Sequence, residues 1–77
     1  MRGRGWSAYH AGEISERTAA IIDMVDEFPE GCIAGDLADQ VGISKKDTAT
    51  YLGRICKYGY IERIGRGLYR PMDVGRP

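Results

Sequence analysis

The chain has 77 residues with 11 basic and 11 acidic side chains, so its formal net charge is zero. A chain of this length forms one small domain that buries about 60% of its unfolded surface, which excludes two independent cores. The longest apolar run, Ala19–Ile22, is far too short for a membrane span, so we expect no association with membranes.

The charges are distributed unevenly along the chain. Residues 1–43 carry three basic and eight acidic side chains, a net charge of −5, whereas residues 44–77 carry eight basic and three acidic ones, a net charge of +5. A basic half is a reason to expect a polyanionic partner. The alternative interpretation is that the two halves attract each other within the fold.

The sequence contains few residues with catalytic or metal-binding chemistry. Cys32 and Cys56 are separated by 23 residues and accompanied only by His10, a set too small for a metal site with ordinary ligand spacing. There is no nucleophile–base pair to build around the histidine and no phosphate-binding loop, so we expect no catalytic residues, no metal, no cofactor and no enzymatic activity. Without a secretory signal we expect both thiols to be reduced and buried in a cytoplasmic protein.

The N-terminal third predicts an arm followed by a helix. Residues 1–12 mix glycine and arginine with Trp6 and Tyr9 without sustained periodicity, so we expect a flexible N-terminal arm. Apolar residues then recur at spacings of 4, 3, 4 and 3, which predicts an amphipathic helix: Ile14, Thr18, Ile21, Val25 and Phe28. Pro29 ends this helix, and its opposite face is acidic.

A short second helix is predicted from Leu37, Ala38 and Val41. Gly42 follows in the position of a left-handed C-cap. No Ser, Thr, Asp or Asn stands where the N-cap should be, and Asp36 in the first turn compensates in part through the helix dipole.

A third helix is predicted from Ser44 to Tyr58, with Gly59 as its stop. Thr48, Leu52 and Ile55 form its buried face, and Lys46, Thr50, Gly53 and Lys57 lie opposite, flanked by Ala49 and Arg54. Lys45 and Lys46 occupy its first turn, where a cation is unfavourable by about 0.3–1 kcal/mol each. A polyanion bound at this helix end would turn both charges into favourable ones.

The remaining residues predict a two-stranded hairpin. Ile61, Glu62 and Ile64 precede a Gly–Arg–Gly tip, and Leu68 and Tyr69 follow it. Arg66 is therefore held out at the tip. We expect Tyr60 and Tyr69 to pack in the core, and residues 72–77 to form a loose C-terminal tail.

The residues DLADQVGISKKDTATYLGRICKYGYIERIGRGLYR resemble a winged helix-turn-helix DNA-binding domain of the MarR and IclR type. The resemblance covers about residues 14–71. It rests on Leu37–Ala38 and Gly42–Ile43, on the Ser–Lys–Lys start of the third helix, on its buried Leu52 and Ile55, and on the YGYIER and GRGLYR segments that enter and leave the wing.

This resemblance implies a mainly α fold with a small β wing: a winged helix-turn-helix of three helices plus a two- to three-stranded antiparallel sheet, over residues 13–71. It implies sequence-specific or semi-specific binding of double-stranded DNA by a small bacterial or phage transcription regulator, such as a repressor, associated with the nucleoid or acting in the host cytoplasm. Recognition helix 44–58 would enter the major groove, and wing 61–70 would contact the adjacent backbone or minor groove. The DNA-binding residues implied are Ser44, Lys45, Lys46, Thr50, Tyr51, Arg54, Lys57, Arg63 and Arg66.

Two matters remain open at this level. The alternative function is a protein-interaction module that docks through the acidic face of the first predicted helix or through Trp6 and Tyr9. A homodimer or a protein partner is compatible with the sequence, and no small-molecule effector is indicated.

Overall fold

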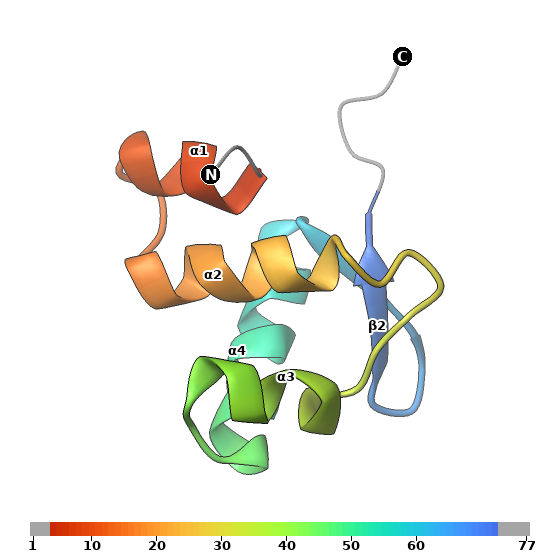
Figure 1. Ribbon diagram of the computed structural model, residues 1–77. Helices are drawn as coiled ribbons and strands as arrows, with labels where there is room; N and C mark the ends of the chain where they lie inside the picture. Colours follow the sequence, from red (N-terminus) through yellow and green to blue (C-terminus); the bar gives the residue numbers. More distant parts are fainter. Residues whose placement is uncertain (1–3, 73–77) are drawn as a thin grey trace.

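The computed structural model of the chain describes residues 4–72. This part of the chain forms four helices and one two-stranded antiparallel sheet, so the fold is mainly α with a small β hairpin (Figure 1). The elements are, in chain order, α1 (Arg4–His10), α2 (Glu16–Val25), α3 (Ala34–Val41), α4 (Lys45–Tyr58), β1 (Ile61–Gly65) and β2 (Leu68–Pro71). Within residues 4–72, no helix is long and apolar enough to cross a membrane.

The second helix, α2, is shorter than its apolar spacing predicted. Ser15 caps it, because the Ser15 hydroxyl oxygen accepts a hydrogen bond from the Thr18 backbone N–H at 3.2 Å. The helix ends at Val25 instead of continuing to Phe28. A residue that precedes proline is disfavoured in the α region, so Phe28, next to Pro29, lies outside the helix while its side chain still packs against the core.

A tight turn joins α3 to α4. It starts at Gly42, whose φ of 85° lies in the left-handed region that favours glycine, and the Gly42 N–H donates to the Ala38 carbonyl at 2.8 Å. At the other end of α3, the Asp36 carboxylate accepts a hydrogen bond from the Ile33 N–H at 2.9 Å. This bond satisfies the N–H group of the residue before the helix, and the Asp36 N–H in turn donates to the Ile33 carbonyl at 2.9 Å, so the start of the short helix is closed without a capping side chain.

The helix α4 ends at Tyr58, as the sequence predicts, and begins at Lys45, one residue after Ser44, which caps it. The Ser44 hydroxyl oxygen accepts a hydrogen bond from the Asp47 N–H at 3.0 Å, and Gly59, with φ of 91°, ends the helix. The side chains of its inward face are fully buried: Thr48, Leu52 and Ile55. The predicted buried face of this helix is confirmed.

The strands β1 and β2 form a hairpin in which Gly67, at the tip, has φ of 69°. The ladder pairs Ile61 with Pro71 and continues to the tip with one irregularity. On the edge of β2 that faces away from β1, Cys32 forms an isolated antiparallel bridge with Tyr69. The two residues exchange backbone hydrogen bonds of 2.7 and 2.8 Å. The sheet therefore has two strands and one bridging residue.

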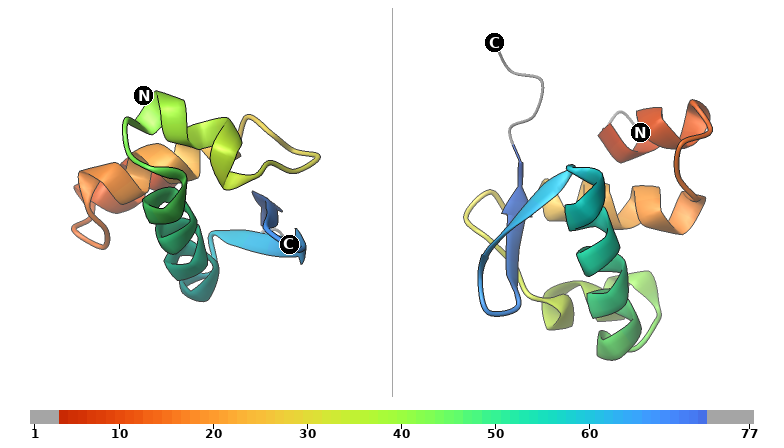
Figure 2. Two further views of the ribbon diagram at one scale, coloured as in Figure 1. Left: turned by 90° about the horizontal axis from the view of Figure 1, so that it is seen from below. Right: turned by 180° about the vertical axis from the view of Figure 1, so that it is seen from behind.

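The core lies where α2, α3, α4 and the hairpin meet (Figure 2). Its buried side chains are Ile21, Ile22, Val25, Cys32, Leu37, Leu52, Ile55 and Ile61. Tyr60 and Tyr69 pack against this cluster, as predicted. Both thiols are free; Cys32 is buried, whereas Cys56 is only half-buried.

The N-terminal segment is the main departure from the predicted fold. Residues 1–12 were expected to form a flexible arm, yet Arg4–His10 forms the helix α1, which lies along α2 (Figures 1 and 2). The fold therefore has four helices where three were predicted. Seven residues are too few for a detectable period, and the face that α1 buries consists of Gly5 and Ala8, which carry almost no hydrophobic signal.

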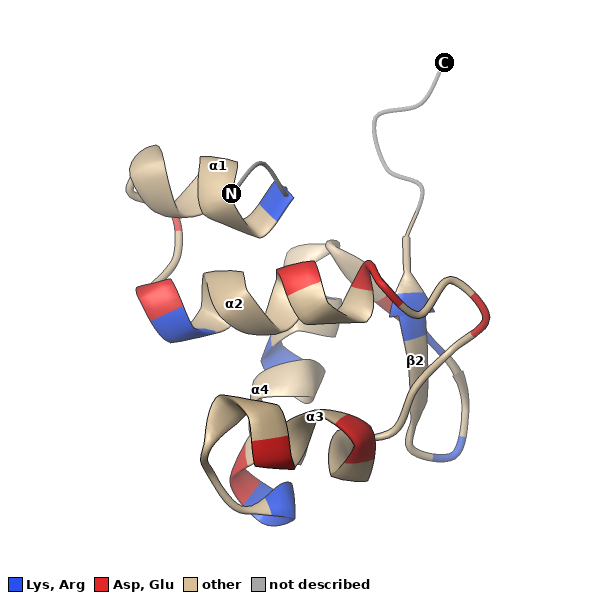
Figure 3. Ribbon diagram, in the orientation of Figure 1, with Lys and Arg blue, Asp and Glu red and all other residues tan. Residues whose placement is uncertain are grey.

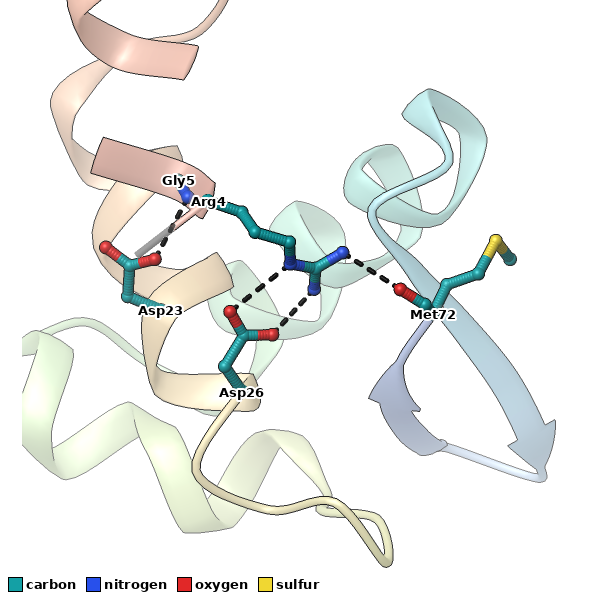
Figure 4. A network of polar contacts seen from close by, with 5 residues as sticks. All are labelled: Arg4, Gly5, Asp23, Asp26 and Met72. Carbon is teal, nitrogen blue, oxygen red and sulfur yellow. Dashed lines mark hydrogen bonds and ion pairs between the residues drawn. The ribbon is translucent and has the colours of Figure 1, made fainter. Parts of the chain in front are cut away.

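Polar contacts fasten α1 to the rest of the domain (Figure 4). The Arg4 guanidinium donates to both carboxylate oxygens of Asp26, at 2.6 and 3.3 Å, and to the Met72 carbonyl at 3.0 Å. The Gly5 N–H donates to the Asp23 carboxylate at 3.0 Å. Arg4 thus joins α1, the end of α2 and the residue after β2. Of the expected tail, Met72 is held by this contact, and residues 73–77 lie outside the described part of the chain.

Two helical glycines should respond to alanine in opposite directions. A Cβ at Gly5 would lie 2.3 Å from the Ala19 carbonyl oxygen, whereas a Cβ at Gly53 would meet nothing within 4 Å. We expect Gly5→Ala to lower the free energy of unfolding by roughly 1–3 kcal/mol through overpacking. We expect Gly53→Ala to raise it by about 0.5–1 kcal/mol through helix propensity. Urea unfolding of both variants measures these changes, and a Gly5→Ala domain as stable as the parent would contradict the close packing of α1 on α2.

The buried thiol of Cys32 should make stability fall at alkaline pH. Burial, with a smaller effect of the Asp36 charge, raises its pKa from 9.0 to about 11. Because the folded state holds the proton more tightly, the stabilisation is complete below pH 9 and is lost as the pH rises towards about 11. Urea unfolding at pH 8 and pH 10.5 should show a larger loss for the parent than for Cys32→Ala. Equal losses in the two proteins would contradict this assignment.

Candidate nucleic-acid interface

The start of α4 presents two cations to solvent. Ser44 caps the helix through its hydroxyl oxygen, which leaves the hydroxyl hydrogen without an acceptor among the described residues. Lys45 and Lys46 follow directly and are exposed. The backbone N–H groups of this helix end and the two ammonium groups therefore lie together, a combination that suits an anion.

The two lysines differ in their surroundings. A Cβ built at Gly35 would lie 3.7 Å from Cε and 3.8 Å from Cδ of Lys45, so the Lys45 stem runs beside the first turn of α3. Lys46 belongs instead to the exposed face of α4, opposite the buried one. The aliphatic stem of Lys45 therefore packs beside α3, whereas Lys46 projects from the exposed face of α4.

The exposed face of α4 continues with small and cationic side chains. Thr50, Arg54 and Lys57 are exposed. The Thr50 hydroxyl donates to the Lys46 carbonyl at 3.1 Å, so its methyl group and oxygen lone pairs remain for an outside partner. Ala49 and Gly53 add almost no side-chain bulk, which allows a partner to approach the helix backbone closely.

Tyr51 lies differently from the other predicted site residues. It is half-buried and packs against the core, on the flank of α4 that faces the α1–α2 connection. Its position next to Arg54 and Tyr58 was not predicted. Positions 51, 54 and 58 share one flank of a helix at 100° per residue, so the sequence did contain a signal for this group.

The hairpin contributes Arg66 and Arg63. Arg66 is exposed at the tip, as predicted. Arg63 is exposed too, but its Nε donates to the Gly65 carbonyl at 3.1 Å, which holds the side chain against the tip of the hairpin. Arg70, the third arginine of the hairpin, is paired with Glu62 at 2.7 Å.

Most of the cations that form no ion pair within residues 4–72 lie on two neighbouring elements, α4 and the hairpin, and Arg17 of α2 is the exception. Ion pairs within residues 4–72 involve Arg4 with Asp26 and Arg70 with Glu62, and none of the predicted interface cations takes part in one: Lys45, Lys46, Arg54, Lys57, Arg63 and Arg66. The start of α4 and the tip of the hairpin lie toward the same end of the molecule (Figures 1 and 2). Acidic residues are concentrated on α2, on α3 and in the connection between them (Figure 3).

Comparisons with known proteins add no further information about this surface. No protein-family model, curated protein or solved structure gives a significant match to the chain. The function has to be inferred from the residues of the surface itself.

The lysines at the two ends of α4 should affect the free energy of unfolding in opposite directions. Lys46 lies in the first turn and Lys57 in the last turn. We expect Lys46→Gln to raise the free energy of unfolding of the free domain by about 0.3–1 kcal/mol at low salt, and Lys57→Gln to lower it by a similar amount. Both shifts should shrink in 1 M salt, where the Debye length falls to about 3 Å. Thermal or urea unfolding at two salt concentrations measures them, and shifts of the same sign would contradict an origin in the helix dipole.

Proposed function

We propose that this chain binds double-stranded DNA as a small winged helix-turn-helix transcription regulator of bacterial or phage type. In this proposal α4 is the recognition helix in the major groove, and the β1–β2 hairpin is the wing on the adjacent backbone or minor groove. The observation that carries the proposal is the set of six cations on these two elements that form no ion pair within residues 4–72, beside an otherwise acidic domain.

The shape of α4 suits this role. A helix with its side chains is about 10–12 Å across, and the major groove of B-form DNA is about 12 Å wide. The inward face of α4 is fully buried, so the helix offers its opposite face to a partner. That face carries small side chains in its middle, at Ala49, Thr50 and Gly53, which allows close approach to base edges.

The side chains of this face favour contacts with the DNA backbone over detailed recognition of the bases. Lys45 and Lys46 suit phosphates, and the free lone pairs and methyl group of Thr50 suit a base edge or a thymine methyl. Lys57, in the last turn, reaches only the backbone. Arg66 at the hairpin tip suits the minor groove or a phosphate, with Arg63 in support. We therefore expect semi-specific binding.

A second candidate function is docking to another protein through α1. Trp6, Tyr9 and His10 form an aromatic cluster, with ring centroids 4.4 Å apart for Trp6 and His10 and 5.8 Å apart for Trp6 and Tyr9. The acidic face of α2 is less suited to docking than the sequence implied, because α1 already engages Asp23 and Asp26. The aromatic cluster is the feature that favours this alternative.

Charge reversal at the proposed interface tests DNA binding. Lys46→Glu and Arg66→Glu should each weaken binding to short duplex DNA and reduce the slope of log K against log salt by about one for each phosphate that is no longer neutralised. Arg17→Glu is the matched control, because Arg17 is exposed on α2, lines the groove toward α3 and belongs to neither of the two elements proposed to contact DNA. Fluorescence anisotropy with labelled duplex measures all four proteins, and circular dichroism confirms that the fold persists.

Two outcomes would count against the proposal. The first is the absence of duplex binding by the parent at low salt and high micromolar protein. The second is an equal effect of all three charge reversals, which would indicate a nonspecific response to net charge. Loss of binding to a protein partner in a Trp6→Ala variant that still binds DNA normally would establish the second function beside the first.

A further inference from the structure

An open hollow lies between the α1–α2 connection and α4. Its volume is about 330 Å³, and Glu13 and Ser15 line one side of it. Tyr51, Arg54 and Tyr58 of α4 line the other side. These three side chains share one flank of α4, directly beside the exposed face proposed to enter the major groove. The hollow is therefore continuous with the proposed interface.

The hollow and the hairpin lie on opposite flanks of α4. β1 contacts α4 and follows it in the chain (Figure 2). The hollow, in contrast, is lined by Ser15 and Thr18 at the start of α2. A duplex whose major groove receives a helix presents one backbone on each side of that helix. One backbone would meet the hairpin, and the other would meet the side chains of the hollow.

The side chains on the α4 side of the hollow suit a phosphodiester. Arg54 is exposed and makes no ion pair within the described residues, so its guanidinium is free to pair with a phosphate. Tyr58 is 59% exposed and Tyr51 is half-buried, and neither phenol forms a hydrogen bond with residues 4–72. Two phenols supply donors for phosphate oxygens and ring surfaces for the adjoining sugars.

Among the described residues, Glu13 is the one carboxylate that lines the hollow. Its Oε1 accepts a hydrogen bond from the Tyr60 hydroxyl at 2.8 Å, which draws the group toward Tyr60 and raises the Tyr60 pKa. The wall that carries Glu13 is held by α1, since the Glu13 N–H donates to the Ala8 carbonyl at 3.0 Å. The helix α1 therefore supports the segment that forms one side of the hollow.

We propose that this hollow receives the sugar-phosphate backbone of the duplex on the flank of α4 opposite the hairpin. Arg54 pairs with the phosphate, and Tyr51 and Tyr58 donate to its oxygens and cover the sugar. The protein then contacts both DNA backbones that border α4: the hairpin contacts one backbone, and the hollow receives the other. This inference rests on the proposed DNA binding and assigns it a second contact region.

The test uses three variants of the full chain, the parent and a short labelled duplex. Arg54→Gln should weaken binding and lower the salt slope by about one, because it removes one phosphate contact. Tyr58→Phe keeps the ring and removes the donor, so it should weaken binding with the salt slope unchanged. Glu13→Gln keeps an acceptor for Tyr60 and removes a negative charge, so it should strengthen binding. Ethylation interference should locate the phosphates that depend on Arg54 and on Arg66 on opposite sides of the groove.

The results separate this inference from the function on which it rests. If Arg54→Gln, Tyr58→Phe and Glu13→Gln all bind like the parent while Lys46→Glu and Arg66→Glu are impaired, the chain binds DNA and the hollow is not a contact. The same conclusion follows if the phosphates that depend on Arg54 and Arg66 lie on one side of the groove. If the parent binds no duplex, both proposals are wrong.

Discussion

The burial of one face of α4 determines where the cations of this domain can lie. Thr48, Leu52 and Ile55 are fully buried, and α4 contacts α2, α3 and β1. Turning the helix about its axis would expose Leu52 and Ile55, at a cost of about 1.5–3 kcal/mol for each side chain. Lys46, Thr50 and Lys57 must therefore face outward, and the flank that carries Tyr51 must face the start of α2. Both proposed contact regions follow from this single packing arrangement.

Much of this arrangement could be predicted because strong local signals agree with the tertiary contacts. The Ser44 cap, the apolar spacing from Thr48 to Ile55 and the glycine after Tyr58 each indicate the same helix, and the structure has it at those bounds. The hairpin is similar, since the glycines around Arg66 permit a turn between two short β-prone runs. The exposure of the predicted interface cations on α4 followed from helix periodicity, and that of Arg66 from its place at the hairpin tip.

The features that sequence reasoning missed depend on contacts between distant residues. α1 packs through Gly5 and Ala8, whose value lies in their small size rather than in hydrophobicity, and its ion pair joins residues 4 and 26. No local pattern reports such a contact. The early end of α2 has a local cause in Pro29, but the apolar spacing up to Phe28 obscured it, because Phe28 packs against the core without being helical.

The contact between Arg4 and the Met72 carbonyl has a practical consequence for experiments on this domain. Residues 4 and 72 are joined by one hydrogen bond of 3.0 Å, so the described chain enters and leaves the fold at neighbouring points. The start of α1 and the end of β2 both lie at the end of the molecule away from the start of α4 and the tip of the hairpin (Figure 1). A short linker could therefore close the chain into a ring, or join two copies in tandem, without crossing the surface proposed to bind DNA. A fluorophore attached near either point would likewise leave that surface unobstructed.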